Sequence, residues 1–251
     1  MDKDELKTIG DIFGWIGTVI TFYFFAAPGV PFYKLLRGQI KLNDAPGFLL
    51  IFSFLNCILW FNYGLLLDRP QMYSTNGVGS GLTLIFVTIF IIFFTKQKYY
   101  LAILCLCGLI ALIIVISYLS YFVIYYKYVG YSANVFNVLM YIATGEKIYR
   151  VFQTKNYNLM PIFSIIGAFL SSSCWLIYGI LDFEINVIIP NALGVVFSII
   201  QLIVYFYFYC KKKSEEKIIE NDASDPKTDE ALTTTASATM ISPIASSEKP
   251  K

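Results

Sequence analysis

The sequence contains no histidine, and only 14% of its 251 residues are charged. Soluble domains average about 25% charged residues, so this composition is not that of an ordinary water-soluble protein. The five cysteines are an odd number, and four of them lie inside apolar segments while Cys210 is the last residue of another, which does not indicate a disulfide framework. We find no nucleotide-binding loop, no metal-ligand spacing and no nucleophile beside a base, so we expect no enzyme, cofactor or metal site.

Lysine and arginine residues do not form a basic stripe that could follow a phosphate backbone, so nucleic acid is not expected as a partner. They lie between long apolar blocks that contain no Asp, Glu, Lys or Arg. These blocks cover residues 12–33, 45–67, 72–95, 99–126, 128–145, 156–181 and 185–210. A helix needs about 20 residues to cross about 30 Å of hydrocarbon, so the sequence predicts an all-α integral membrane protein with seven transmembrane helices in a lipid bilayer.

Two of the blocks differ from the others. The first follows a leader that contains Asp2, Asp4 and Glu5, whereas a cleaved signal peptide needs a basic leader, so we interpret the block as a membrane helix. The block at 128–145 is the least apolar of the seven, and Gly145 interrupts its pattern.

The basic residues predict the orientation of the chain. Eleven fall on one side of the seven crossings, namely Lys34, Arg37, Lys41, Lys96, Lys98, Lys147, Arg150, Lys155, Lys211, Lys212 and Lys213, and four fall on the other side. Cytoplasmic loops of membrane proteins are rich in Lys and Arg, so we expect the amino terminus outside and the carboxyl terminus in the cytosol. We expect the plasma membrane, with the Golgi or another endomembrane as the alternative.

The last segment, residues 214–251, is rich in Glu, Asp, Lys, Ser and Thr and nearly lacks aromatic residues. Such a segment cannot bury enough apolar surface to fold, so the sequence predicts a disordered cytosolic tail. Thr233, Thr234, Thr235 and Ser242 are candidates for phosphorylation there, and a passive solvated tail is the simpler expectation.

An internal repeat organises the apolar blocks. A shift of 115 residues matches Pro46 with Pro161, Trp60 with Trp175, Tyr63 with Tyr178, Asn76 with Asn191 and Gly79 with Gly194. The sequence therefore predicts a three-helix repeat at 1–98, a linker helix at 99–127 and a second three-helix repeat at 128–213. Parallel repeats of this kind are one plan for transporters, with the substrate near the midplane between them. A seven-helix receptor is the alternative, but it gives no reason for the duplication.

The repeated polar and aromatic residues are the candidate site. An amide in hydrocarbon must be hydrogen-bonded, and the carboxamides of Asn76 and Asn191 can donate to and accept from sugar hydroxyls. The indoles of Trp60 and Trp175 can stack on a sugar ring. The alternatives are hydrogen bonds between helices for the asparagines and anchoring at the membrane interface for the tryptophans.

The absence of histidine, and of Asp or Glu in the middle of any block, argues against the proton relay of a coupled carrier. We therefore expect a passive uniporter. Pro28, Pro46, Pro161 and Pro190 can kink helices and act as hinges, although bent helices are also ordinary in membranes.

These motifs together resemble the SWEET family of eukaryotic sugar transporters. The resemblance rests on Leu59 to Gly64, Asn76 to Gly79, Met140-Tyr141, Met160-Pro161, Cys174 to Gly179 and Ile189 to Gly194. It implies seven helices in a three-one-three plan and facilitative, proton-independent, bidirectional transport of mono- or disaccharides, with glucose or another hexose as the expected substrate. It also implies that Asn76, Asn191, Trp60 and Trp175 bind the sugar, and that a homo-oligomer can form.

The resemblance further implies a gate and hinges. The gate would contain Tyr63, Tyr178, Asp182 and Glu184, and Pro28, Pro46 and Pro161 would be hinge prolines. The family has a fourth proline where this chain has Thr144, followed by Gly145, so flexibility at that hinge would come from the glycine. A related carrier of amino acids and a non-transporting membrane receptor are the alternatives. The Pro-Gln pair typical of the related carriers is absent at Pro28 and at Thr144.

Overall fold

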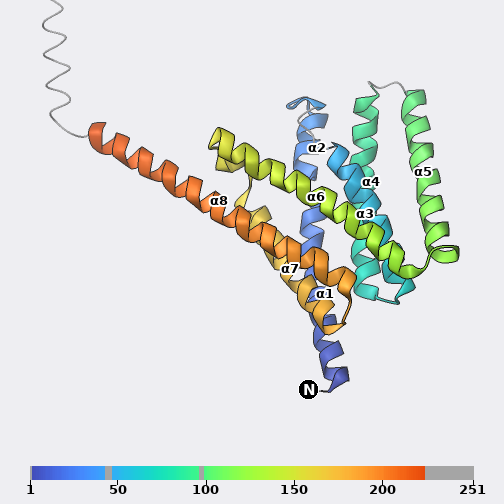
Figure 1. The fold of residues 1–251 in the computed structure, drawn as a ribbon. Coiled ribbons are helices and arrows are strands. Elements are labelled where there is room, and N and C mark those ends of the chain that lie inside the picture. Colours follow the sequence, from blue (N-terminus) through green and yellow to red (C-terminus); the bar gives the residue numbers. More distant parts are fainter. Residues whose placement is uncertain (1, 43–46, 96–98, 224–251) are drawn as a thin grey trace, which may run out of the picture. The chain divides into compact units, whose positions relative to one another are not determined.

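The computed structural model describes residues 2–42, 47–95 and 99–223, and the regular structure in these residues is helical (Figure 1). The elements are α1 (Lys3–Ala26), α2 (Gly29–Leu36), α3 (Gly47–Leu66), α4 (Pro70–Phe94), α5 (Tyr99–Phe122), α6 (Tyr126–Thr154), the short 3-10 helix η2 (Tyr157–Leu159), α7 (Ile162–Leu181) and α8 (Ile185–Ala223). The chain divides into two units, Met1–Tyr205 and Phe206–Lys251, and the candidate site described below lies in the first.

The first predicted crossing is built from two helices. Helix α1 ends at Ala26 and α2 begins at Gly29, so the break falls at Pro28, which has no N–H to donate to the preceding turn. Together α1 and α2 form one apolar span, Asp4–Leu36. With α1 and α2 counted as one crossing, the described α-helices correspond to the seven that the sequence predicts.

Five of these crossings are long and apolar enough to span a membrane by composition alone, and α3 supplies a shorter apolar helix, Leu50–Leu66. Helix α6 is not among the five, in keeping with its low apolar content. The apolar block ends at Gly145, but α6 continues through this glycine to Thr154. The Thr144 hydroxyl donates to the carbonyl of Met140, and Arg150 pairs with Glu146 at 2.7 Å, so local contacts support the helix on both sides of the glycine.

The expected boundary at residue 213 does not coincide with the end of a helix. Helix α8 continues to Ala223, so residues 214–223, which the sequence predicts to be disordered, are helical. Lys212 lies 3.7 Å from Glu216, one helical turn on, and this pair and its neighbouring helix-forming residues favour continuation. Residues 224–251, with the candidate phosphorylation sites, and the hinge candidate Pro46 lie outside the described residues.

Packing within Met1–Tyr205 follows the repeat. Helix α1 of the first repeat packs against α7 of the second, and α3 of the first packs against α6 of the second. In each case the first helix of one repeat meets the second helix of the other. The interface between the repeats therefore consists of two equivalent helix pairs, as expected for two related bundles.

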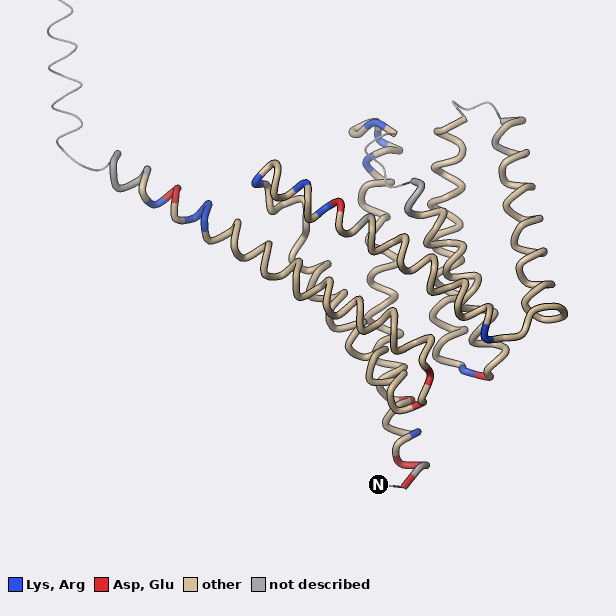
Figure 2. Tube along the Cα trace, viewed as in Figure 1, with Lys and Arg blue, Asp and Glu red and all other residues tan. Residues whose placement is uncertain are grey.

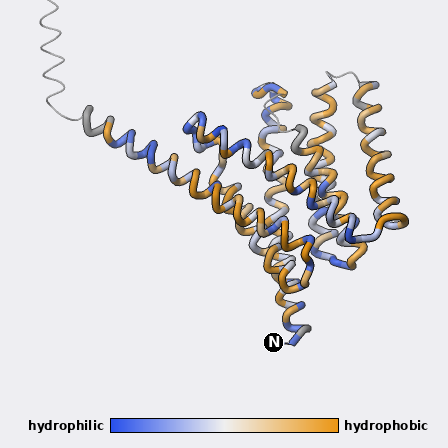
Figure 3. The backbone as a smooth tube through the Cα atoms, viewed as in Figure 1, coloured by the Kyte–Doolittle hydropathy of each residue, from blue (hydrophilic) through white to orange (hydrophobic). Residues whose placement is uncertain are grey.

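The linker helix α5 packs against α3 and α4 of the first repeat. Its remaining surface is apolar and exposed, as Leu104 (68% exposed) and Ile114 (62%) illustrate, and Figure 3 shows a hydrophobic helix over most of its length. An exposed apolar surface of this kind is stable against lipid rather than water.

Candidate functional site

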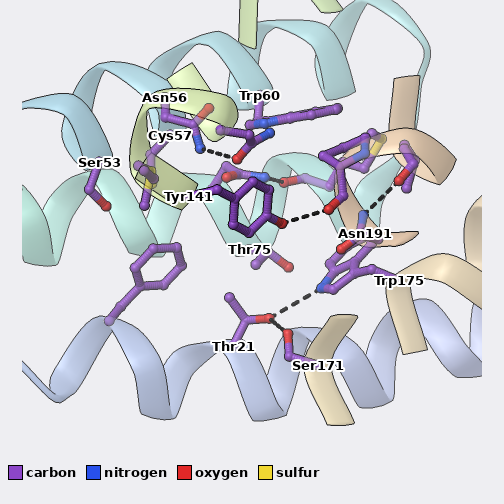
Figure 4. A pocket seen from close by; sticks show the side chains of 17 residues that line it. Thr21, Ser53, Asn56, Cys57, Trp60, Thr75, Tyr141, Ser171, Trp175 and Asn191 are labelled. Carbon is purple, nitrogen blue, oxygen red and sulfur yellow. Dashed lines mark hydrogen bonds between the residues drawn. The ribbon is translucent and has the colours of Figure 1, made fainter. Parts of the chain in front are cut away.

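A cavity of about 220 Å³ lies at the interface between the repeats. Side chains from α1, α3, α4, α6, α7 and α8 line it, and among them are the four residues singled out by the repeat: Trp60, Asn76, Trp175 and Asn191. Figure 4 shows Trp60, Trp175 and Asn191 with their neighbours around this space. The structure therefore brings together residues that are more than a hundred positions apart in the chain.

The two asparagines have matching geometry. The Nδ2 group of Asn76 donates to the carbonyl of Met72 at 2.9 Å, and that of Asn191 donates to the carbonyl of Val187 at 2.7 Å. Each amide thus satisfies one N–H on its own helix, one turn back, and this bond fixes the side-chain rotamer. The carboxamide oxygen and the second N–H are the groups that can serve a ligand in the cavity.

The two tryptophans are also placed alike. Trp60 and Trp175 are buried, and each packs edge-on against a tyrosine of its own helix, Tyr63 at 5.7 Å and Tyr178 at 5.4 Å between ring centroids. Their burial at the cavity argues against anchors at a lipid–water interface. The indole N–H of Trp175 donates to the Thr21 hydroxyl at 3.1 Å.

Two further polar pairs line the cavity, and the sequence reasoning missed both. Asn56 Nδ2 on α3 donates to Asn137 Oδ1 on α6 at 3.2 Å, and the hydroxyls of Thr21 on α1 and Ser171 on α7 lie 2.8 Å apart. Each pair joins one repeat to the other. The Oδ1 atom of Asn56 is buried without a hydrogen-bond partner among the described residues, so it is available to a donor in the cavity.

The internal repeat contains the pattern from which these pairs could have been predicted. Asn56 matches Ser171 at the shift of 115 residues, and Thr21 matches Asn137 at the shift that aligns the first helices. Each position is polar in both copies. Asn56 and Ser171 lie one helical turn before Trp60 and Trp175. A hydroxyl or amide alone is a weak signal in a membrane helix, and only the matching of positions makes it informative.

A set of polar contacts closes the cavity on one side. We call it the amino-terminal side, because α1, α4, α6 and α8 begin there. The hydroxyl of Tyr63 donates to Glu184 Oε1 at 2.8 Å, and Asn186 Nδ2 donates to the Tyr63 oxygen at 2.8 Å. These bonds join the end of α3 to the start of α8, and therefore the first repeat to the second.

Charged residues on the amino-terminal side add to this closure. Arg69 lies 2.7 Å from Asp182, and Gln71 donates to Asp11 at 2.8 Å. Burial raises the pKa of the Asp182 carboxyl above its ordinary range, and the neighbouring Arg69 limits the rise. Tyr178, also predicted for the gate, is buried under Trp175, and its hydroxyl has no hydrogen-bond partner among the described residues.

The loops that carry these residues are copies of each other. Asp68 and Phe183, which match at the repeat shift, both have left-handed backbone conformations, with φ of 52° and 54°. The next residue in each loop donates its backbone N–H to the carbonyl of a glycine: Arg69 to Gly64 at 2.8 Å, and Glu184 to Gly179 at 2.9 Å. These are the bonds of a helix that ends in a left-handed residue. The repeat is thus present in the backbone as well as in the sequence.

A family model described as sugar efflux transporter for intercellular exchange matches residues 11–98 and 127–214. The chain belongs to this family, the SWEET transporters. One relative, a bidirectional sugar transporter SWEET5 of Arabidopsis thaliana, is 33% identical over 219 residues, which are 80% of this chain and 87% of the relative. A second, a bidirectional sugar transporter SWEET1a of Sorghum bicolor, is 31% identical over 204 residues, which are 78% of this chain and 76% of the relative.

The fold is that of a SWEET protein as well. A solved structure of a eukaryotic SWEET transporter superposes with a TM-score of 0.71 at 23% identity, covering 82% of this chain and 99% of that one. Seven helices and a multi-pass membrane protein, as predicted from the apolar blocks, are confirmed by this likeness and by the family. The match is to a family of transporters and not of enzymes, in agreement with the sequence analysis.

The hinge candidates of this SWEET chain lie in different settings. Pro28 stands at the break between α1 and α2, and Pro161 directly precedes α7. Thr144 and Gly145 lie inside the continuous helix α6. A Cβ atom added at Gly145 would meet no other atom within 4 Å, so close packing does not explain this glycine.

Proposed function

We propose that this protein is a facilitative sugar carrier that moves a monosaccharide such as glucose in both directions across a membrane by alternating access. One observation carries the proposal: at the interface between the two repeats lies a cavity lined by one asparagine and one tryptophan from matched positions of each repeat. The asparagines are Asn76 and Asn191, and the tryptophans are Trp60 and Trp175. The relatives' names, which specify bidirectional sugar transport, support the same reading.

The chemistry of the cavity suits a sugar. Amide and hydroxyl groups both donate and accept, as sugar hydroxyls do, and an indole face can cover the C–H face of a ring. Among the described residues that line the cavity, none carries a charge. An amino acid would need partners for its ammonium and carboxylate groups, so a neutral polyol is the better candidate.

The size of the cavity favours one sugar ring. Its volume of about 220 Å³ lies below the roughly 300–1,000 Å³ typical of pockets for drug-sized ligands. A disaccharide would need the repeats to separate further than in this conformation. We therefore propose a hexose as the substrate.

Transport by alternating access follows from the closure on the amino-terminal side. The bonds of Tyr63 to Glu184 and of Arg69 to Asp182 join the repeats there. We infer that in this conformation the sugar exchanges with the opposite side, and that release toward the amino-terminal side requires these bonds to break. No charged group in the described lining of the cavity would take up a proton during this cycle, so the carrier is proton-independent.

Charge supports the predicted orientation. Lys34 lies near the end of α2, and Lys147 and Arg150 lie in the last two turns of α6. Figure 2 shows basic residues at these helix ends, away from the start of α1. By the rule that basic residues face the cytosol, the amino terminus is outside. We propose the plasma membrane as the site of function, which surface labelling of intact cells would distinguish from the Golgi.

The test is counterflow in proteoliposomes that contain only this chain. Labelled glucose should accumulate against preloaded glucose, and a panel of hexoses, sucrose and amino acids should compete in the order that the cavity predicts, with single-ring sugars first. Substitution Asn158→Ala, at an exposed asparagine, is the matched control for Asn191→Ala. Absence of counterflow with every sugar, from folded protein, would overturn the proposal.

A further inference from the structure

Each repeat places an aromatic ring of its first helix against a glycine of its third helix. A Cβ atom on Gly79 would lie 2.5 Å from the ring of Phe25, and one on Gly194 would lie 2.9 Å from the hydroxyl oxygen of Tyr141. Phe25 and Tyr141 match at the shift that aligns the first helices, and both line the cavity. The two contacts are therefore copies of each other, but one has a hydroxyl group that the other lacks.

The hydroxyl group makes a bond found only in the second of these copies. Tyr141 donates to the carbonyl oxygen of Pro190 at 2.5 Å, which joins α6 to α8 within the second repeat (Figure 4). Pro190 lies inside α8, whereas its counterpart in the first repeat is Thr75, whose hydroxyl oxygen lies 2.6 Å from the carbonyl oxygen of Gln71 and 2.7 Å from the hydroxyl oxygen of Thr18. The third helix has an interior proline in the second repeat and a hydroxyl side chain at the same place in the first.

The position of the Tyr141 ring is fixed by its neighbours. The ring stacks on Phe197 with parallel planes and 5.1 Å between centroids. Gly194 lies one helical turn after Pro190, on the same face of α8, so the absence of a side chain there leaves the Pro190 carbonyl open to the tyrosine. Ser172 of α7 also contacts this point, so three helices of the second repeat meet at Gly194.

The bond acts where α8 is weakest. Proline has no N–H for the carbonyl one turn earlier, so the helix can bend at this turn. Asn191 is the next residue, and the bond from its amide to Val187 spans the same turn. Any bending of α8 at this turn would therefore move the Asn191 side chain relative to the cavity.

We propose that Tyr141 is a positioning residue for Asn191: its hydroxyl, bonded to the Pro190 carbonyl, holds the turn of α8 that contains the proline, so that the Asn191 amide is preset for the sugar. The proposal rests on the proposed function. Asn76 needs no such bond, because its helix has no proline at the matching position. The two amides are thus held in place by different means, although they occupy equivalent positions.

The decisive variant is Tyr141→Phe, which removes the hydroxyl and keeps the ring. A neutral hydrogen bond that presets a binding group accounts for a factor of roughly five in affinity, so the half-saturating glucose concentration in counterflow should rise about fivefold, with the maximal rate within about twofold. The control is Tyr149→Phe, on the same helix, whose side chain is 62% exposed; it should leave both values unchanged. An unchanged glucose affinity in Tyr141→Phe would overturn the proposal.

A second comparison separates positioning from a general structural role. In an Asn191→Ser background, Tyr141→Phe should not weaken glucose binding further, whereas in an Asn76→Ser background it should still cost about fivefold. Equal effects in both backgrounds would contradict the proposal. Binding is measured by equilibrium displacement of labelled glucose from purified full-length protein, so that slow variants can still be compared.

If Tyr141→Phe does not accumulate as folded protein, Pro190→Ala provides the test. Without the proline α8 regains its backbone bond, so Tyr141→Phe in this background should fold and bind glucose as Pro190→Ala alone does. A remaining fivefold loss there would contradict the proposal. If the unaltered protein neither binds nor exchanges any sugar, the proposed function fails, which is a different outcome from failure of the Tyr141 proposal.

Discussion

The hydroxyl of Tyr63 lies 2.8 Å from Oε1 of Glu184, so a phenol of the first repeat is bonded to a carboxylate of the second. The repeat would lead one to expect a second such bond, from Tyr178 to the residue that matches Glu184, which is Arg69. Instead, Arg69 pairs with Asp182, and Tyr178 is buried without a hydrogen-bond partner among the described residues. The closure on the amino-terminal side is therefore asymmetric, although the loops that form it are copies.

We expect Tyr63→Phe to loosen this closure. A hydrogen bond to a charged group contributes about 1.5–3 kcal/mol, so the open conformation should become at least about tenfold more populated. Cys57 lines the cavity and provides the readout, after replacement of the other four cysteines. A membrane-impermeant thiol reagent applied on the amino-terminal side should modify Cys57 faster in Tyr63→Phe than in the control Tyr128→Phe, whose side chain is exposed. Equal rates would show that this bond does not hold the closure.

The pair of Arg69 and Asp182 should behave as a unit. Their side chains are 27% and 14% exposed, so the loss of one partner should cost about 2 kcal/mol, between the values for surface and buried pairs. Arg69→Asp and Asp182→Arg should each increase Cys57 modification from the amino-terminal side, and the double swap should restore it in part. A double swap that is worse than either single substitution would contradict the pairing.

Acid should favour the closed conformation. The pKa of Asp182 is raised in the closed form, so its carboxyl binds a proton more tightly there than in an open form, where it is solvated. The resulting stabilisation is present below the ordinary pKa of the open form and is lost as pH rises through the raised value. Modification of Cys57 from the amino-terminal side should therefore slow as pH falls, after correction for thiol ionisation with a model thiol. Asp182→Asn should remove this dependence, and an unchanged profile would assign the effect to another group.

We expect Gly79→Ala to impair transport more than folding. The new methyl group would stand 2.5 Å from the ring of Phe25, which lines the cavity and can be displaced into it. The gain in helix propensity, about 1 kcal/mol, offsets much of the packing cost. Glucose counterflow should fall about tenfold, with little change in unfolding temperature. The control is Gly81→Ala on the same helix, where nothing lies within 4 Å, and equal activity of the two variants would contradict this account.

Much of the candidate site could be predicted because the chain contains it twice. A single Asn or Trp in a membrane helix has several explanations, but Asn76 with Asn191 and Trp60 with Trp175 at one shift have few. The same comparison predicted the two three-helix bundles. The partners of these residues could not be predicted, since Trp175 to Thr21 and Asn56 to Asn137 are contacts between helices whose rotation is set by packing.

Local sequence patterns predicted the helix boundaries less well. The apolar block ends at Gly145, but a glycine costs a helix only about 1 kcal/mol, and the pair of Glu146 and Arg150 supports α6 beyond it. The polar composition after Lys213 suggested disorder. Residues 214–223 nevertheless extend α8, because adding residues to an existing helix avoids the cost of nucleation. In both places contacts within the helix itself favour its continuation.

The central claim is that a sugar lies in the cavity between Asn76 and Asn191, and protection of Cys57 tests it most directly. In protein whose other cysteines are replaced, saturating glucose should slow the reaction of Cys57 with a small maleimide, at the concentration that half-saturates counterflow. Asn76→Ala and Asn191→Ala should each abolish this protection while Cys57 still reacts. Full reactivity of Cys57 under saturating glucose, in protein that still exchanges glucose, would place the sugar elsewhere and contradict the account.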